Sequence, residues 1–513
     1  MSMRAGRKSR SSLALRAGLA VTLMVLFYAL AIAATAALIW LGVRIGGSIL
    51  DAGRVSVGIV ILGIACFIAA GVIVWSVMPR FDTFEPPGPE VTSAQHPDLF
   101  AEIARVAEAT GQREPEHVYL VSDVNAFVAQ RGGFMGFGAS RVMGIGLPLM
   151  RTLSVDELRA VLAHEMGHFY GGDTKLGPWI YKTRGALVRT VFNLGRATQH
   201  ASVSGLASAM FVVIHAPFRW FLLGFMRVSQ AISRAQEYSA DAVAVRAEGQ
   251  RAMIEGLKKT HAAAIAHLLY MHNDVAPLLE HGKLPDVGEG FSRYLANDRL
   301  NKLLDEVVED ELSAGHRDPY DSHPPLRERI AAASEVEGPS RQPDPRFAIS
   351  LVRDPDTIEL ADIERRVNIK LERISWNDTA SIWEKRWRAE LAEPNFPTIS
   401  AVDVTTDVAQ IRRHAAAMLG EGAIASVADD EILHGWMHVV FVRLACQLLD
   451  AGFKLSASPG VPYTFTKEGV SVEIYEDVRK RVLGELSPDE WRAKCELLGL
   501  TTPDLPPRRA AAT

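Results

Sequence analysis

The chain has 513 residues, of which 48% are hydrophobic and 22% are charged. This composition excludes an intrinsically disordered or collagen-like chain, and the length suits roughly two to four domains. The 3 cysteines are too few and too scattered for a disulfide framework or a cysteine zinc site. The formal net charge of −5 argues against a general nucleic-acid binder.

The first eighty residues carry the strongest apolar pattern. Residues 1–16 hold basic side chains and no acid, and residues 17–43 and 55–79 contain no charged side chain at all. A helix of about 20 apolar residues crosses a membrane, so each run predicts a transmembrane helix, with two buried core helices as the alternative. A small-residue stretch at 31–36 fits a signal-peptide cleavage site, but the apolar run continues past it and favours an uncleaved anchor. The basic start and Arg80 predict that the rest of the chain is cytoplasmic.

The pattern then changes to that of a mixed soluble chain. Amphipathic periodicity predicts a helix over residues 97–110, and a short apolar run predicts a strand over 117–121. Two further extended segments, at about 125–130 and 141–147, flank a Gly-rich stretch and predict a hairpin. A second long helix is expected over 219–248.

A metal-binding motif lies on a helix with a clear start. Ser154-Val155-Asp156-Glu157 is a capping box, and Gly171-Gly172 marks the expected end of the helix. Within it stands His164-Glu165-Met166-Gly167-His168, where two histidines at i and i+4 share one face and can reach the same Zn²⁺. Glu165 lies beside that face, where its carboxylate can accept a proton from an attacking water. The motif predicts a zinc-dependent hydrolase.

A catalytic zinc site needs a third protein ligand and one open position. The metzincin pattern fails here, because position 174 is threonine instead of histidine. Downstream, Arg234, Glu237 and Asp241 follow helical spacing and share one face. On an arbitrary helix such a trio is a solvated charge cluster. The functional interpretation makes Glu237 the third zinc ligand, with Arg234 and Asp241 supporting the ligands from behind.

Together these elements resemble the HtpX and CAAX-prenyl-protease type of integral-membrane zinc metallopeptidases, in which HExxH is followed by R-x-x-E-x-x-A-D. Asn125-Ala126-Phe127 resembles the N-A-F motif of this family, and the SHPPLRERI sequence at 322–330 resembles its [ST]-H-P-P-x-x-x-R-I segment. The resemblance covers roughly residues 90–332. It implies the gluzincin arrangement, in which three protein ligands hold one zinc ion and a separate residue acts as the general base. These residues are His164, His168 and Glu237 as ligands and Glu165 as base.

The resemblance also implies substrate contacts. It assigns His323 to stabilisation of the oxyanion, and the strand near Asn125 to holding the substrate in extended form. A structural interpretation of His323 is a helix start followed by proline, and both interpretations stay open. The chain departs from the family where residues 176–196 carry too many basic side chains for lipid, although relatives often have two further spans in this region. Residues 203–226 are apolar but interrupted, so membrane contact and a buried helix pair both remain possible.

The expected fold class is α+β and mainly helical, with a zincin-type catalytic domain that contains a small sheet. Pro-rich segments delimit three predicted parts. They are a basic segment with two transmembrane helices, a zinc metallopeptidase domain and a mixed α/β accessory domain of unknown function, at 1–80, 90–335 and 347–508. A second histidine pair, His434 and His438, lacks the glutamate of the motif and is expected to be a structural helix face.

The predicted function is that of a membrane-anchored zinc metalloendopeptidase that cleaves membrane or membrane-proximal proteins in protein quality control. The expected partners are polypeptide substrates and the lipid bilayer, with no nucleic acid, and the oligomeric state stays open. The expected location is the bacterial inner membrane, with a multi-pass anchor and a cytoplasmic catalytic domain. The alternative is a proteolytically silent membrane scaffold with a structural zinc site.

Overall fold

The computed structural model describes most of the chain in two packed units. The described residues are 2–51, 56–78, 84–132, 138–169, 177–200, 205–313, 324–367, 370–394, 396, 404, 406–424 and 427–500. They are mainly helical with three small sheets, which agrees with the coarse fold class. One unit comprises residues 1–265 and 304–362, and the other comprises 266–303 and 363–513. Residues 266–303 therefore pack with the C-terminal region, and the predicted functional boundaries stay a prediction.

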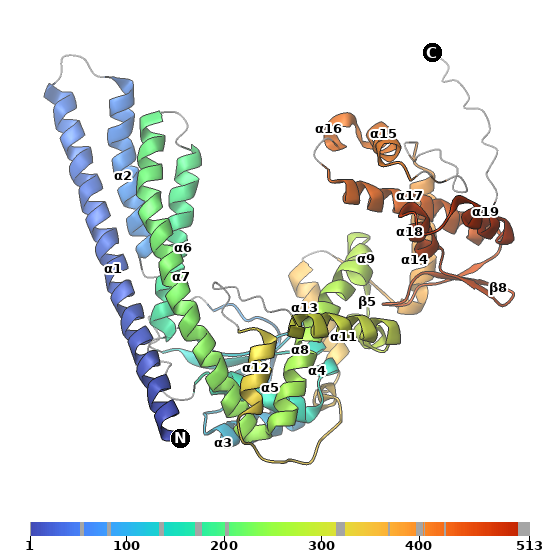
Figure 1. Ribbon diagram of the computed structural model, residues 1–513, viewed down its shortest axis with the longest axis horizontal. Coiled ribbons are helices and arrows are strands. Elements are labelled where there is room, and N and C mark those ends of the chain that lie inside the picture. Colours follow the sequence, from blue (N-terminus) through green and yellow to red (C-terminus); the bar gives the residue numbers. More distant parts are fainter. Residues whose placement is uncertain are drawn as a thin grey trace. The chain divides into compact units, whose positions relative to one another are not determined.

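The N-terminal part of the first unit is a bundle of four long helices that lie side by side (Figure 1). They are α1 (Ser2–Asp51), α2 (Val57–Val77), α6 (Gly177–His200) and α7 (Gly205–Glu248). Phe27, Phe211 and Phe218 are buried between them, whereas Trp75 and Trp220 point outward and are more than half exposed. Large apolar side chains on the outside of a bundle are expected where lipid surrounds it.

Four described helices are long and apolar enough to cross a membrane. They are α1 from Gly18 onward, α2, α7 and α17 (Asp429–Asp450). In α1, α2 and α7 at most 33% of the apolar window is buried, but in α17 67% is buried. We therefore interpret α17 as a core helix of its own unit and the other three as candidate spans. The described part of the apolar run at 203–226, which begins at Gly205, forms the first half of α7.

Helix α6 packs in the same bundle although it is basic. The Nε atom of Arg189 donates a hydrogen bond to the carbonyl oxygen of Ser76 at 3.2 Å, and Asn193 Nδ2 donates to Ser76 Oγ at 3.0 Å. These bonds pair polar groups of α6 with the last turn of α2. A polar helix can lie against apolar neighbours when its polar groups are paired in this way.

The four-stranded sheet lies in the first unit and has the strand order β1-β2-β4-β3. Its strands are β1 (Glu90–Val91), β2 (His117–Val121), β3 (Ala126–Arg131) and β4 (Ser140–Gly146). Strands β2 and β4 are parallel, while β3 and β4 form an antiparallel pair. The predicted strand and hairpin are confirmed, and β3 lies at the edge of the sheet.

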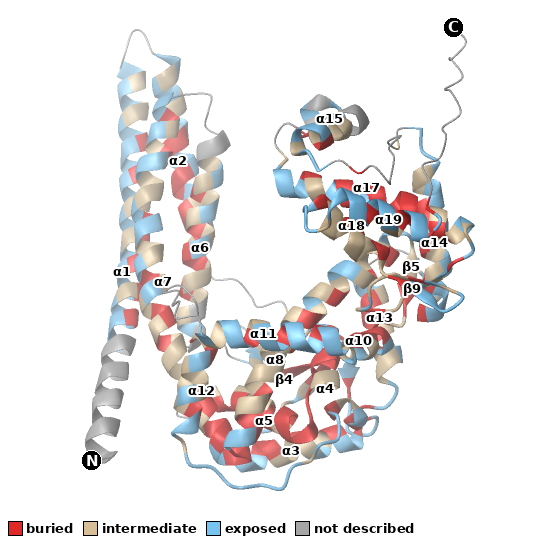
Figure 2. Cartoon of the chain, turned by 45° about the vertical axis from the view of Figure 1, so that its right-hand side comes forward, coloured by how far each residue is buried: buried red, intermediate tan, exposed pale blue. Residues whose placement is uncertain are grey.

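Helices cover this sheet and form the core of the unit. They are α3 (Pro97–Thr110), α4 (Leu147–Thr152), α5 (Val155–Gly167), α12 (Leu326–Ser334) and the 3₁₀ helix η4 (Ala348–Leu351). Helix α3 matches the predicted helix in both of its ends. Helix α5 is mostly buried (Figure 2), and it packs against both α3 and α7. Three further helices contain residues of both units, α8 (Gln250–Tyr270), α11 (Asp298–Ser313) and α13 (Pro355–Val367).

The Pro-rich segment at 337–346 is packed against the start of α5. The backbone N–H of Val155 donates to the carbonyl of Arg346 at 2.9 Å, and the N–H of Ala348 donates to the carbonyl of Leu153 at 2.9 Å. These hydrogen bonds satisfy backbone groups next to the first turn of α5. The segment therefore fixes the beginning of the helix that carries the metal-binding motif.

The second unit is built of short helices around an aromatic core. Its helices are α9 (Ala276–Glu280), α10 (Val287–Leu295), α14 (Thr379–Leu391), α15 (Val408–Leu419), α16 (Glu421–Ile424), α17, α18 (Ile474–Val482) and α19 (Pro488–Leu497), with the π-helix η3 (Met271–Val275) and the 3₁₀ helix η5 (Trp376–Asp378). Its strands are β5 (Lys283–Pro285), β6 (Glu372–Ile374), β7 (Lys454–Ser456), β8 (Thr464–Lys467) and β9 (Val470–Val472). The fully buried rings of Trp387, Phe441 and Phe465 lie at its centre.

Candidate metal centre

Helix α5 begins as predicted and ends earlier than predicted. The capping box forms at Ser154, whose backbone N–H donates to the Glu157 carboxylate at 2.8 Å. The helix ends at Gly167, and not at the glycine pair four residues further on. The next residue, His168, keeps nearly helical angles of φ −60° and ψ −19°. It therefore stays one turn from His164 on the same face.

The early end of α5 coincides with a close approach to α7. A Cβ atom at Gly167 would lie 3.0 Å from the Cα atom of Ala240, closer than side chains normally come to a backbone. Glycine at this position lets the two helices approach each other. The approach brings the histidines of α5 opposite Glu237, one turn before Ala240 on α7.

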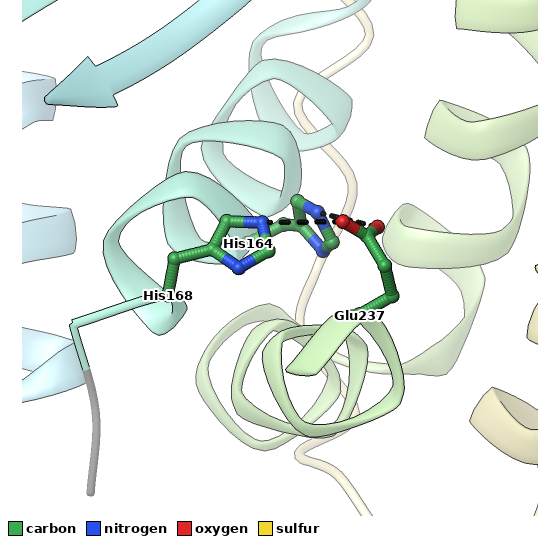
Figure 3. Close-up of side chains that lie close together, drawn as sticks. All are labelled: His164, His168 and Glu237. Atoms are coloured by element: carbon green, nitrogen blue, oxygen red, sulfur yellow. Dashed lines mark ion pairs between the residues drawn. The ribbon is translucent and has the colours of Figure 1, made fainter. Parts of the chain in front are cut away.

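The side chains of His164, His168 and Glu237 point toward one another (Figure 3). One ligand atom from each lies within 4.8 Å of the others. The Nε2 atom of His164 is 3.5 Å from Glu237 Oε2, and the Nε2 atom of His168 is 3.7 Å from Glu237 Oε1. His164 and Glu237 are buried, and His168 is partly exposed. The three residues of the predicted ligand set are thus brought together.

The geometry fits a zinc ion. Ligands about 2.0–2.2 Å from a tetrahedral zinc lie roughly 3.3–3.5 Å from each other. Each histidine lies near this separation from one oxygen of Glu237, His164 from Oε2 and His168 from Oε1. Two imidazole nitrogens and one carboxylate oxygen are a donor set that zinc prefers, and three protein ligands leave one position for water or substrate.

A buried ion pair between Asp241 and Arg329 contacts the metal ligands and holds them in place. The Nδ1 atom of His164 lies 2.8 Å from Asp241 Oδ1, so a proton on Nδ1 leaves the lone pair of Nε2 directed at Glu237. Arg329 binds Asp241 with two hydrogen bonds, from Nε at 3.0 Å and from Nη2 at 2.6 Å. The same Nη2 is 3.5 Å from Glu237 Oε2. Arg329 thus holds both acidic side chains of α7 in place.

The two histidines differ in protonation. Burial opposes a charge on His164, but its hydrogen bonds to Asp241 and Glu237 outweigh burial and raise its pKa to about 9. Burial, together with the nearby charge of His164, lowers the pKa of His168 to about 4. At neutral pH His168 therefore offers a free lone pair, whereas His164 must release a proton before it can bind a metal.

The N-A-F motif holds the edge strand next to α5. The carbonyl of Asn125 accepts a hydrogen bond from the N–H of Gly146 at 2.7 Å. On the paired strands Phe127 lies opposite Gly144, where its ring occupies the space that a side chain would need. This contact secures the register of β3 on β4. The motif therefore has a structural role in addition to the predicted contact with substrate.

For the other predicted site residues, the structure gives fewer contacts on which to judge their roles. Glu165 follows His164 on α5, and its negative charge is one of the influences that raise the pKa of His164. Arg234 lies one turn before Glu237, and its supporting role stays a prediction. His323 lies outside the described residues, so both interpretations of it stay open.

Arg329 is the site residue that sequence reasoning missed. It stands in the SHPPLRERI motif, in which the sequence assigned a role only to His323. The described part of this motif docks on α7 through Arg329 and through Glu328, whose Oε2 accepts a hydrogen bond from the Tyr238 hydroxyl at 2.9 Å. An arginine 88 positions away from its aspartate has no local pattern to reveal the pair. Its place in a shared motif was the available signal.

Comparison with known proteins agrees with this geometry. Residues 93–337 match the model of Peptidase family M48. This part of the chain is similar to the metallopeptidases of family M48. The predicted family resemblance and the predicted class of enzyme are confirmed.

Individual relatives match part of the chain. Protease HtpX of Mannheimia succiniciproducens is 26% identical over 273 residues, which are 50% of this chain and 89% of that protein. Protease HtpX of Stenotrophomonas maltophilia is 28% identical over 249 residues, 46% of this chain and 70% of that protein. A Protease HtpX homolog of Archaeoglobus fulgidus is 31% identical over 162 residues, 31% of this chain but only 45% of that protein. No solved structure matches the chain with significance.

Proposed function

We propose that this chain is a membrane-anchored zinc endopeptidase that cleaves membrane or membrane-proximal polypeptides. The observation that carries the proposal is the convergence of His164, His168 and Glu237 from two helices, with Glu165 on the same helix as the histidines. A zinc ion bound by these ligands would polarise the scissile carbonyl and lower the pKa of water.

The residues of the chain supply the other parts of the mechanism. Glu165 takes the proton of the attacking water and passes it to the leaving amine. Asp241 and Arg329 keep His164 and Glu237 in one orientation, so that no rearrangement is needed when the substrate binds. Strand β3 lies at the sheet edge and packs against α5, so an extended substrate can pair with it as an additional strand.

The anchor supports the choice of substrate. Helix α7 is continuous from its apolar first half to Glu237, so the bundle is covalently and rigidly linked to the ligand set. A catalytic centre fixed to the membrane meets membrane proteins more often than soluble ones. We further propose that the peptidase faces the cytoplasm and acts in quality control, which rests on the basic N-terminal segment and on the similarity to Protease HtpX.

The proposal is tested with the full-length protein purified in detergent and loaded with zinc. We expect it to cleave an unfolded model protein, and we expect Glu165→Gln to lower the rate by about 10²–10⁴-fold while zinc stays bound. The exposed Glu335→Gln, which removes the same charge elsewhere in the unit, is the matched control and should cleave normally.

Two outcomes would contradict the proposal. If the zinc-loaded protein gave no products, the scaffold with a structural zinc would be favoured. If Glu165→Gln cleaved as fast as the unchanged protein, the role of Glu165 as proton acceptor would be rejected.

A further inference from the structure

The two histidines of the metal centre are held in different ways. The Nδ1 atom of His164 contacts the Asp241 carboxylate at 2.8 Å, and the side chain is only 9% exposed. The side chain of His168 is 31% exposed, and within the described part of the chain its Nδ1 atom takes part in no hydrogen bond. A metal-binding histidine usually has a partner on its second nitrogen that fixes the ring. The orientation of His168 therefore depends on its backbone.

That backbone lies where α5 ends (Figure 3). His168 directly follows Gly167, the last residue of the helix. The backbone N–H of Phe169 donates to the carbonyl of Met166 at 3.0 Å, which closes a tighter turn than that of an α-helix. The last residues of a helix fray unless contacts outside the helix secure them. His168 thus needs such a contact more than His164 does.

A cation–π contact joins this end of α5 to the sheet. The guanidinium carbon of Arg141, on β4, lies 4.4 Å from the centroid of the Phe169 ring. Such a contact is attractive within about 6 Å, and more so where water is partly excluded. Both residues are partly buried. Phe169 is the immediate neighbour of His168, so the contact restrains the backbone on the C-terminal side of this ligand.

Arg141 is itself fixed by three other contacts. Its Nη1 atom donates to the carbonyl of Arg113 at 2.8 Å, in the loop after α3. Its backbone carbonyl accepts a hydrogen bond from the N–H of Glu116 at 2.8 Å, and it pairs with Gln130 of β3 across the sheet. A guanidinium that is already ordered loses little further conformational entropy when it stacks on a ring. Arg141 is therefore a rigid support for Phe169.

We propose that Arg141 and Phe169 form a clamp that positions His168. The clamp fixes the backbone of His168 so that its imidazole faces Glu237, and it takes the place of the hydrogen bond that Asp241 gives to His164. Neither side chain is a metal ligand, and both are positioning residues that act through the backbone. This inference rests on the zinc centre of the proposed function.

The test is the zinc affinity of the full-length protein in detergent, measured by competition with a chelator and without a substrate. Arg141→Met keeps the apolar stem and removes the charge, and Phe169→Leu keeps an apolar side chain and removes the ring. We expect each variant to bind zinc about tenfold more weakly, at the lower end of the effect of residues that orient metal ligands.

Further variants separate positioning from a general loss of stability. The double variant should bind zinc no more weakly than either single variant, because both changes break the same contact. Phe169→Tyr keeps the face of the ring, so its zinc affinity should stay within about threefold of that of the unchanged protein. The matched control is Arg386→Met, which removes an arginine that stacks on Trp383 at 5.2 Å in the second unit and should leave zinc binding unchanged.

The outcomes distinguish the clamp from the metal centre. If the unchanged protein bound no zinc, the proposed function and the clamp would both be rejected. If it bound zinc and both single variants bound it as tightly, only the clamp would be rejected. The clamp would also be rejected if the effects of the two changes added up in the double variant. Arg141→Met and Phe169→Leu test one contact from its two sides, so either variant decides the matter if the other does not fold.

Discussion

Two helices of this protein carry histidines at i and i+4, and only one of them forms a metal centre. On α5, His164 is buried and faces Glu237 of a second helix. On α17, His434 and His438 are exposed. His434 Nδ1 contacts the carbonyl of Asp430 one turn earlier at 2.7 Å, and His438 Nε2 contacts Glu390 at 2.9 Å.

The difference lies in what the neighbouring element contributes. Among the described residues, the group His164, His168 and Glu237 is the only one with three potential ligand atoms in mutual reach. The α17 histidines contact different acceptors, the carbonyl of Asp430 on their own helix and the carboxylate of Glu390 on α14. Helical spacing thus supplies two ligands, but a metal centre also needs a third ligand from another helix and supports that leave the lone pairs free.

The largest effect is expected from removing that third ligand. Glu237→Ala should reduce zinc from one ion per chain to almost none and lower proteolysis on the order of 10³-fold or more. Metal content is measured by elemental analysis after dialysis, with Glu335→Ala as the control. An unchanged zinc content would show that Glu237 is not a ligand.

A smaller effect is expected from the supporting aspartate. Asp241→Asn removes the charge that orients His164, so zinc affinity should fall by about 10–100-fold while zinc still binds at high concentration. Competition with a chelator measures the change. Arg234→Gln serves as the parallel variant, and a comparable loss there would confirm its predicted supporting role. If Asp241→Asn bound zinc normally, the hydrogen bond to His164 would not be needed for affinity.

The contrast extends to a buried carboxylate of the first unit, Asp241, and a partly buried one of the second unit, Asp274. Asp241 has a histidine and an arginine as partners, whereas Asp274 of the second unit accepts a hydrogen bond from the N–H of Gly460 at 3.2 Å. Burial raises the pKa of Asp274 from 3.8 to about 6. A carboxyl whose pKa rises on folding stabilises the fold below the unfolded pKa and loses this contribution as pH rises through the folded pKa.

Asp274→Asn should therefore stabilise the second unit above pH 6, by at most about 3 kcal/mol, and have little effect below pH 4. Thermal unfolding of the full chain across this pH range measures the change in stability, which is read from the transition of the C-terminal region. A stabilisation that is the same at pH 4 and pH 7 would contradict the assignment to ionisation of Asp274.

The smallest effect is expected at the second histidine pair. His438→Ala should leave the zinc content at its original value and change the free energy of unfolding by less than about 1 kcal/mol, because the pair with Glu390 is partly exposed. Loss of one zinc ion in this variant would remove the distinction between the two helices.

Much of the peptidase unit could be predicted from local pattern. The helix over 97–110, the strand over 117–121 and the start of α5 depend on periodicity and on a capping box, and the structure has them at those places. The end of α5 was predicted too late, because the glycine pair after it is a strong local stop signal. The actual end lies at Gly167, where the helix meets α7.

Other parts had no local signal. The basic segment at 176–196 was predicted to be too charged for lipid, and its packing could not be predicted; in the structure Arg189 and Asn193 of α6 both contact Ser76 of α2. Residues 266–303 precede the predicted boundary and yet pack with the C-terminal unit. Contacts over such distances in the sequence depend on the whole fold and leave no periodic trace.

The sequence by itself determined the apolar character that makes the N-terminal helices candidate membrane spans, the pair of histidines and the acidic candidates on α7, because residue type and helical spacing are local properties. Only the tertiary structure decided that Glu237 faces both histidines, that Asp241 holds His164 and that Arg329 binds Asp241. The physical reason is that coordination needs atoms within about 4 Å of each other. That proximity comes from the packing of α5, α7 and α12, which no single segment encodes.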